Sequence, residues 1–275
     1  MNKQKFYIIL GGFPEAYNDP NFLNIISGIS NNLKVQFTFN KKEIMYIGQA
    51  EDIEIRICFC WDPLRDNFYN FFGNQYKSEY PTHTIPLPSY ELVKNITDAN
   101  AVLFLGLCGS FKDKIGELFL PDNFYLGCFK DDKVNDKNWK DGTVIDSDDI
   151  ENIKLNNKIH LNNYLSDKDS NEINVITTNL TVIPKHVKKE VVSLFYNKLK
   201  SKINIVEKES YFIVEHFKKY KIPIGVGICS SDGLADPNNM MHNGTHSFPL
   251  KEMNEKLPLA AKLMFEKLKK EGFCK

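Results

Sequence analysis

Arginine is almost absent from this chain of 275 residues. Arg56 and Arg65 are the only two, and lysine supplies every other basic side chain apart from histidine. Lys and Arg together number 35, as do Asp and Glu, so the formal net charge is +0. A chain without a basic excess lacks the electrostatic footprint of proteins that bind nucleic acid or anionic membranes, and we expect neither partner. Because arginine is preferred for bidentate phosphate recognition, its scarcity also leaves few candidate phosphate ligands.

Long apolar runs and paired cysteines are also missing. No apolar run approaches the roughly 18 residues that a membrane-spanning helix needs, and no secretory leader precedes the first apolar run at 6–10. The six cysteines include no Cys-x-x-Cys pair, and most lie within apolar runs. We therefore expect buried, reduced thiols and a cytoplasmic protein.

A metal-binding signature is lacking as well. His242 and His246 are four residues apart, but the glutamate of a His-Glu-x-x-His motif and an evident third ligand are both missing. The pair fits a polar loop better than a metal site. We expect no metal ion and no cofactor.

Short apolar runs alternate with helical patterns, which predicts a single α/β domain over residues 1–275. No internal repeat or linker divides the chain. The predicted strands cover 6–10, 35–39, 44–47, 53–60, 101–105, 173–178, 203–206 and 224–229, and the predicted helices cover 22–29, 184–199 and 250–270. Residues 130–171 are rich in Asp, Asn and Lys, and we expect a polar, lid-like insertion there.

Two acidic side chains stand at the ends of consecutive strands. Glu209 follows the run 203–206 and precedes a helical pattern, and Asp232 follows the strand predicted over 224–229. Ligands of parallel α/β sheets bind at the carboxyl ends of the strands, so the two carboxylates are expected to share one pocket. The same residue types also suit helix capping and the helix dipole, and spacing alone leaves both roles open.

The residues around these acids carry a family resemblance. Val206-Glu207-Lys208-Glu209-Ser210 resembles the V-E-M-E-(S/A) segment of the purine nucleoside phosphorylase and nucleosidase superfamily, and Ser231-Asp232 resembles its S-D pair. The resemblance implies that Glu209 holds ribose hydroxyls and that Asp232 protonates or hydrogen-bonds the departing purine. Lys208 replaces the methionine that packs on the sugar in that family.

Two glycine-containing segments extend the resemblance. Gly106-Leu107-Cys108-Gly109-Ser110 is similar to the family's G-(T/S/K)-(A/C)-G-(G/S) segment. It implies that Gly106, Cys108 and Gly109, with Ser231, line the base and sugar pocket. Glu15 follows the Gly11-Gly12 turn and is the nearest match to the acid with which nucleosidases of the family position the attacking water, while a solvated loop acid is an equally good interpretation of this position.

The resemblance also implies a fold and an assembly. Members have a mixed, partly barrel-like central sheet flanked by helices, and they form dimers, trimers or hexamers. We therefore expect a homo-oligomer, with the aromatic run 68–72 as a candidate for burial between subunits.

The choice between water and phosphate as nucleophile depends on two further positions. Phe104 and Leu107 stand where phosphorylases of this family have an arginine and a hydroxyl, and neither side chain can donate a hydrogen bond. Hydrolysis of a purine nucleoside or nucleotide is therefore the favoured activity. Two alternatives stay open: phosphorolysis with Arg65 as the phosphate ligand, and a catalytically inert relative that only binds a nucleoside.

Overall fold

The fold is described from a computed structural model. The description covers residues 3–11, 20–60, 90–111, 116–128, 154–166, 172–178, 197, 199–207, 209–233 and 250–272. The strands are β1 (Gln4–Gly11), β2 (Thr38–Asn40), β3 (Met45–Ala50), β4 (Ile53–Cys60), β5 (Ala101–Ser110), β6 (Leu118–Phe119), β7 (Asn123–Cys128), β8 (Lys154–His160), β9 (Asn174–Thr178), β10 (Ile205–Glu207) and β11 (Ile224–Gly233). The helices are α1 (Pro20–Leu33), α3 (Tyr90–Lys94), α7 (Ser210–Lys219) and α8 (Leu250–Lys270).

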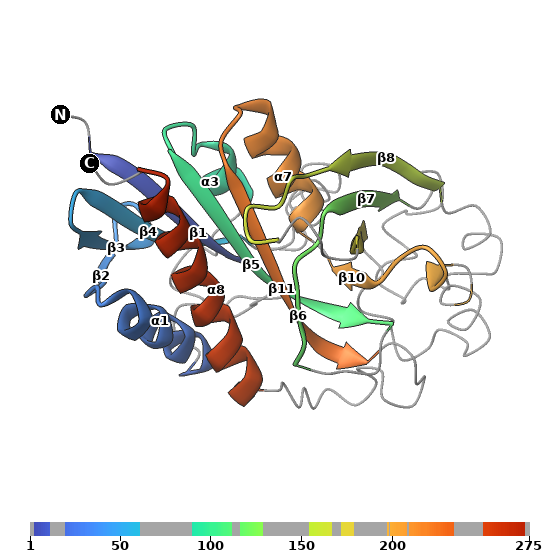
Figure 1. The fold of residues 1–275 in the computed structure, drawn as a ribbon, viewed down its shortest axis with the longest axis horizontal. Helices are drawn as coiled ribbons and strands as arrows, with labels where there is room; N and C mark the ends of the chain where they lie inside the picture. The colour runs from blue at the N-terminus through green and yellow to red at the C-terminus, as the bar shows by residue number, and fades with distance from the viewer. Residues whose placement is uncertain are drawn as a thin grey trace, which may run out of the picture.

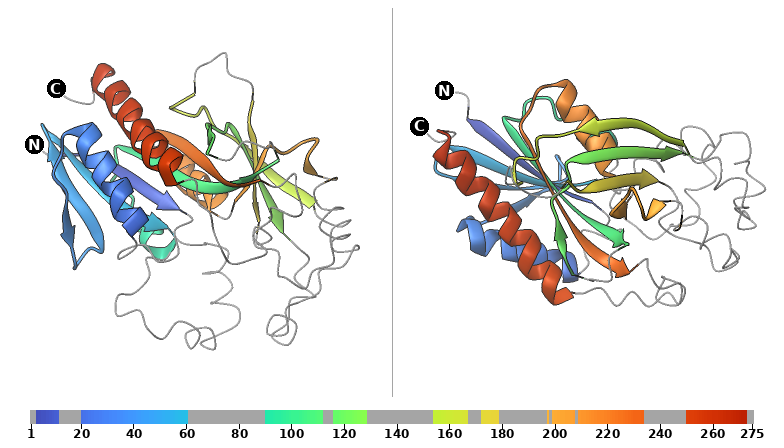
Figure 2. Two further views of the ribbon diagram at one scale, coloured as in Figure 1. Left: turned by 90° about the horizontal axis from the view of Figure 1, so that it is seen from below. Right: turned by 45° about the vertical axis from the view of Figure 1, so that its right-hand side comes forward.

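All of these strands belong to one mixed sheet, in the order β2-β3-β4-β1-β5-β10-β9-β7-β8, with β11 paired to β5 and β6 (Figure 1). β1 is parallel to β4 and β5, whereas β10 is antiparallel to β5. Helices α1 and α8 lie side by side on one face, and α7 lies on the other (Figure 2). The predicted single α/β domain with a mixed sheet flanked by helices is confirmed.

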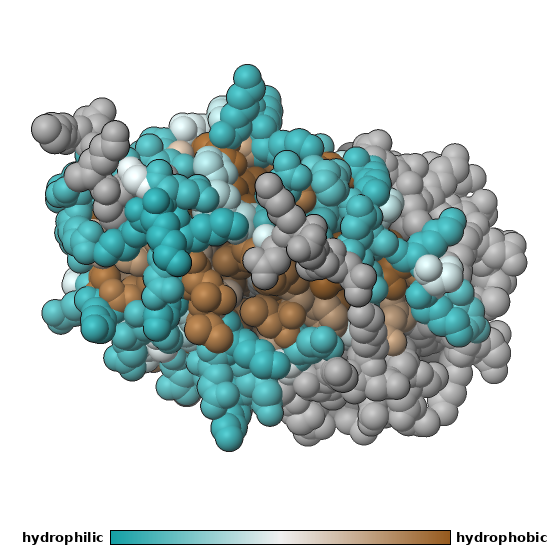
Figure 3. Space-filling model, in the orientation of Figure 1, coloured by the Kyte–Doolittle hydropathy of each residue, from teal (hydrophilic) through white to brown (hydrophobic). Residues whose placement is uncertain are grey.

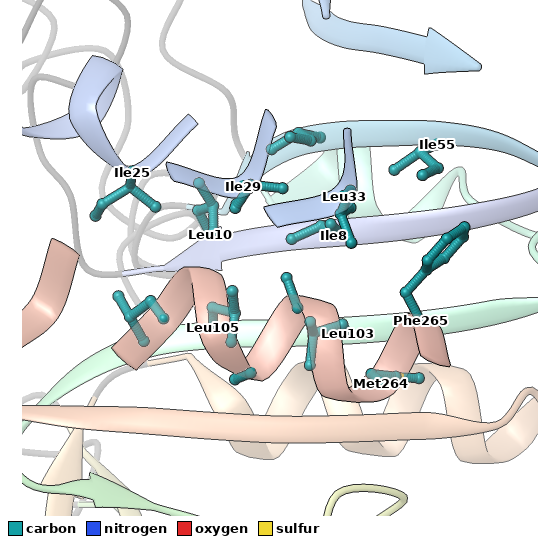
Figure 4. Close-up of a cluster of buried hydrophobic side chains, with 14 of the residues drawn as sticks. Ile8, Leu10, Ile25, Ile29, Leu33, Ile55, Leu103, Leu105, Met264 and Phe265 are labelled. Carbon is teal, nitrogen blue, oxygen red and sulfur yellow. The ribbon is translucent and has the colours of Figure 1, made fainter. Parts of the chain in front are cut away.

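The core between the sheet and the α1–α8 pair is mostly aliphatic. Ile8 and Leu10 of β1 and Leu103 and Leu105 of β5 point toward side chains of both helices (Figure 4). Residues of α8 spaced three and four apart supply the helix side of this core; they are Met253, Leu257, Ala260, Ala261, Met264, Phe265 and Leu268. This is the apolar stripe of an amphipathic helix, and the helix predicted over 250–270 has those bounds.

The outer surface over the two helices also carries apolar side chains. Apolar residues gather along α8 and beside it, with polar residues around them (Figure 3). Leu259 and Leu263 lie one turn apart on α8 and are about half exposed, at 46% and 51%. Within the part of the chain described, no helix is long and apolar enough to cross a membrane.

The opposite face of the sheet packs against α7. Ile213, Val214 and Phe217 of this helix are fully buried, together with Phe104 and Ile228 of the sheet. The helical pattern expected after Glu209 is therefore confirmed. Within the segment expected to form a lid, β8 is a strand of the sheet and pairs with β7; 129–153 and 167–171 lie outside the described residues.

Two strands run further than the sequence indicates. β5 continues through Gly106 and Gly109 to Ser110, five residues beyond its predicted end at Leu105. β11 likewise continues through Ser231 to Gly233. The reason is mutual pairing, since Cys108 faces Ser230 and Gly109 faces Asp232 in the parallel β5–β11 ladder. The predicted site segments thus belong to the sheet itself.

Candidate active site

The site region is organised by the edge of β5 opposite β11. The first half of that edge, Ala101 to Leu105, pairs with β1. Its last two residues, Gly109 and Ser110, pair with β10, which runs in the opposite direction. β1 ends at Gly11 and β10 ends at Glu207, so the two strand ends approach one another from either side of Gly106–Cys108.

Glu209 lies at the junction, the region beside Gly106–Cys108 where the ends of β1 and β10 approach one another. Its side chain is only 3% exposed. A methyl group placed on Gly11 would lie 3.5 Å from the Cγ atom of Glu209 and 2.5 Å from the Cε2 atom of Phe104. The end of β1, the Phe104 ring and the Glu209 side chain are therefore immediate neighbours, and glycine at position 11 is what leaves room for them.

Asp232 reaches the same part of β5 from the other edge. Gly109 pairs with Val206 of β10 on one side and with Asp232 of β11 on the other. Since neighbouring strands are about 4.8 Å apart, the backbones of Val206 and Asp232 lie roughly 10 Å apart. The segments that carry Glu209 and Asp232 are close to one another, as expected, but for a different reason from the one given by the sequence. β10 and β11 flank β5 in opposite directions rather than ending at one rim of a parallel sheet.

A bulge in β11 adjusts the backbone just before Asp232. The register shifts between Ser230 and Asp232, so Ser231 is the extra residue, and its hydroxyl donates to the carbonyl of Cys108 at 3.2 Å. The backbone N–H of Ser230 donates to the carbonyl of Glu117, the residue before β6, at 2.9 Å. Bulges commonly re-aim side chains next to active sites. Here the bulge leaves Ser231 outside the ladder, with its hydroxyl bonded to Cys108 of β5, and Asp232 pairs with Gly109 one residue later.

Glu207 has a role that the sequence analysis did not assign. Its buried carboxylate accepts the backbone N–H groups of Glu209 at 2.6 Å and Ser210 at 2.7 Å, and the hydroxyls of Ser210 and Thr177. Thr177 in turn accepts the N–H of Tyr211 at 3.0 Å. Burial raises the pKa of Glu207, while these hydrogen bonds act in the opposite direction. The first amides of α7 are thus bound by protein groups.

Phe104 and Leu107 lie on opposite faces of β5. The Phe104 ring is fully buried in the core beneath α7, and a methyl group on Gly106 would lie 2.9 Å from it. Leu107 belongs to the core beneath α8. The ring therefore fills the space beside both Gly11 and Gly106 with carbon, and no polar atom of this side chain faces the junction.

Several predicted residues lie outside the described part of the chain. These are Glu15, Arg65 and Lys208, the aromatic run 68–72, and the pair His242 and His246. For Asp232 the backbone is described and the side chain is not. Among the described residues, no group of three His, Cys, Asp or Glu side chains is arranged to hold a metal ion.

No family model matches the chain, and no curated protein matches its sequence. Solved structures do match. The 5′-methylthioadenosine/S-adenosylhomocysteine nucleosidase of Helicobacter pylori superposes with a TM-score of 0.54 at 15% identity, over 98% of this chain and 100% of that one. MTAN from Chlamydia trachomatis gives 0.51 at 11% identity, over 96% and 98%. The futalosine hydrolase of Helicobacter pylori gives 0.50 at 15% identity, over 98% of each chain.

The chain has the nucleosidase fold. These superpositions cover nearly the whole of each chain, so the predicted fold class is confirmed. At 15% identity or less, the superpositions establish the fold and leave substrate and mechanism to be argued from the residues of this chain.

Proposed function

We propose that this nucleosidase-fold protein hydrolyses the N-ribosyl bond of a purine nucleoside or nucleotide. Asp232 is the proposed general acid toward the base, and Glu209 the proposed ligand of the ribose hydroxyls. The observation that carries the proposal is the register at Gly109, which pairs with Val206 on one side and Asp232 on the other. The two segments that resemble the family's catalytic motifs are thereby neighbours across a single strand.

The proposed chemistry follows from the charges of these groups. The bond from the sugar carbon to the ring nitrogen breaks with its electron pair moving to the base, and Asp232 gives that base a proton, an effect worth about 10²- to 10⁴-fold in rate. The sugar becomes cationic in the transition state, which the nearby Glu209 carboxylate stabilises. Water adds to the sugar carbon and loses a proton to Glu15, so that one water is consumed per bond cleaved.

Water is preferred to phosphate as the nucleophile for three reasons. A phosphate dianion needs several donors, and the Phe104 ring that lies between Gly11 and Gly106 provides none. The helix N-terminus beside it would ordinarily attract an anion, but Glu207 and Thr177 already accept the N–H groups of Glu209, Ser210 and Tyr211. A carboxylate at that position also repels phosphate.

Glu15 and Arg65 complete the proposal from the sequence. Glu15 follows Gly11 by four residues, a span of at most about 14 Å in extended chain, so it is within reach of the junction. Arg65 follows β4, the neighbour of β1, and is the candidate ligand for a phosphate, either as co-substrate or as a 5′ substituent. Gly106, Cys108, Gly109, Ser231 and Lys208 are the proposed lining of the base and sugar pocket.

The substrate class is proposed from the residues together with the neighbours' names. Those proteins are named for 5′-methylthioadenosine, S-adenosylhomocysteine and futalosine. We propose a small-molecule nucleoside substrate and no cofactor. We also propose that the protein acts as a homo-oligomer and that the segment 130–171 contains a lid over the site.

The test is release of free base from adenosine, inosine, AMP and 5′-methylthioadenosine, followed by chromatography. We expect at least one of them to be cleaved, and Asp232→Asn to abolish that release. Binding of a nucleoside without any base release, under conditions where a known nucleosidase is active, would instead favour an inert nucleoside-binding protein.

A further inference from the structure

Two glutamates two residues apart have separate tasks at the start of α7. Glu209 is the N-cap residue, a position at which a side chain normally accepts an N–H group of its own helix. The Glu209 side chain makes no such bond. Its Cγ atom lies instead beside Gly11, at the end of β1.

The capping is done by Glu207, the last residue of β10. One carboxylate oxygen accepts the N–H groups of Glu209 and Ser210, and the other accepts the hydroxyls of Ser210 and Thr177. Both oxygens of Glu207 are therefore engaged by the protein, and its side chain is 2% exposed. These contacts join β9, β10 and α7 at a single buried carboxylate.

We propose that Glu207 is a positioning residue for Glu209, an inference that rests on the proposed role of Glu209 in binding ribose. Glu207 caps the helix in place of Glu209, whose side chain lies toward the end of β1, and Glu207 fixes the backbone from which that side chain extends. Hydrogen bonds to a buried charge are short and strong, so they hold that backbone firmly. Site groups need placement within about 0.5 Å to function, which gives such an anchor a measurable effect.

The proposal is tested with Glu207→Ala and Glu207→Gln. The amide of glutamine keeps an oxygen for the two backbone N–H groups and turns its NH₂ toward the hydroxyls of Thr177 and Ser210, which can accept. Alanine removes the cap altogether. Each variant is assayed on a riboside and on its 2′-deoxy analogue, because only the riboside offers Glu209 its 2′-hydroxyl. The riboside is the one among adenosine, inosine and 5′-methylthioadenosine that the unmodified protein cleaves fastest.

We expect Glu207→Ala to lower kcat/KM for the riboside about 10- to 100-fold, as loss of an outer-shell partner does at metal sites. The deoxy analogue should be much less affected, so the preference for the riboside falls. Glu207→Gln should restore most of it. In a Glu209→Gln background, Glu207→Ala should cause little further loss, since residues that act through one another are not additive. Glu215→Ala, at an exposed position of the same helix, is the matched control and should change neither rate.

The outcomes separate this inference from the proposed function. If Glu207→Ala lowers kcat/KM equally for the riboside and its 2′-deoxy analogue, Glu207 has no positioning role. The same holds if Glu207→Gln does not restore the preference for the riboside. If Glu209→Gln alone leaves the riboside preference unchanged, the ribose-binding role of Glu209 fails, and this inference fails with it. Hydrogen exchange gives a readout without substrate: the amides of Glu209, Ser210 and Tyr211 should exchange faster in Glu207→Ala and not in Glu207→Gln, and unchanged exchange in the alanine variant would overturn the proposal.

Discussion

The carboxylate of Glu207 accepts the backbone N–H group of Glu209 at 2.6 Å. Both acids are buried, at 2% and 3% exposure, although a buried carboxylate is costly unless donors surround it. For Glu207 the donors come from the start of α7 and from Thr177 on β9. These hydrogen bonds stabilise the turn between β10 and α7, which carries Glu209, the proposed ligand of the ribose hydroxyls.

Near-isosteric replacement of the two proposed site acids should separate catalysis from folding. We expect Glu209→Gln and Asp232→Asn each to lower kcat/KM by about 10²-fold or more, because each removes a charge or a proton that the transition state requires. Melting temperatures should stay within a few degrees of the parent. Retained activity in a variant that loses several degrees of stability would show that its acid is structural.

The sequence accounts well for elements whose signal is local. The bounds of α8 follow from helical apolar periodicity, and those of β4 from a strand-like run in which Glu54 and Arg56 alternate with isoleucines before the apolar stretch 57–60. Helix α8 includes Pro258, whose ring packs beside Gly28 of α1. β8 was not predicted, because the sequence Lys154–His160 is polar and becomes a strand only through its pairing with β7. Pairing between distant segments also explains why β5 and β11 extend past their apolar runs.

The contact of the Phe104 ring with Gly11 should be detectable by mutational coupling. A methyl group on Gly11 would lie 2.5 Å from the ring and 3.5 Å from Glu209 Cγ, so Gly11→Ala should lower both stability and activity. Phe104→Leu removes ring atoms, and the double variant should be more stable than the two single effects predict, by about 0.5–3 kcal/mol.

Denaturant unfolding measures this coupling. Gly227→Ala is the control, because its new methyl group would lie no closer than 3.3 Å to any neighbour and faces Leu105, Leu118 and Ala260. Additive effects of Gly11→Ala and Phe104→Leu would mean that the ring does not occupy the space beside Gly11.

Asn163 holds the edge of β11 in place. Its amide donates to the carbonyls of Pro121 and Val226 and accepts the N–H groups of Val226 and Leu165, at 2.8–3.1 Å. Asn163→Ala leaves buried backbone groups without partners, and we expect a loss of about 2–4 kcal/mol in the free energy of unfolding. Asn162→Ala, at the exposed neighbouring position, should cost less than about 0.5 kcal/mol. Equal effects of the two variants in urea unfolding would contradict this assignment.

His216 should make stability depend on pH near neutrality. Burial lowers the pKa of His216, with Lys219 and Lys94 acting in the same direction, and its ring bonds the carbonyl of Ile96. The folded protein therefore favours the neutral ring. The stability it contributes is present above about pH 6.5, the ordinary value, and is lost as the pH falls through the lower, folded-state pKa.

Urea unfolding from pH 7.5 to 5.5 is the measurement for this residue. The midpoint of the parent should fall further over that range than that of His216→Gln, which has no proton to take up. Parallel curves for the two proteins would mean that the histidine has the same pKa folded and unfolded.

The candidate site was only partly accessible from the sequence. Glu209, Ser231 and Asp232 could be singled out because they match short family motifs. The pairing of Gly109 with both β10 and β11 could not, since it depends on strand direction, and β10 proved antiparallel to β5. The role of Glu207 was also missed. The one available signal was a second acid two residues before the first, and only the position of Thr177 on the neighbouring strand gives it meaning.

Hydrolysis is the central claim, and the identity of the sugar product tests it most directly. The best nucleoside substrate is incubated with and without millimolar phosphate, and the sugar is identified by mass spectrometry. We predict a free sugar with an unmodified hydroxyl at its anomeric carbon, formed at the same rate in both cases. A sugar 1-phosphate whose formation requires phosphate would contradict the account and would make Arg65 the next residue to replace.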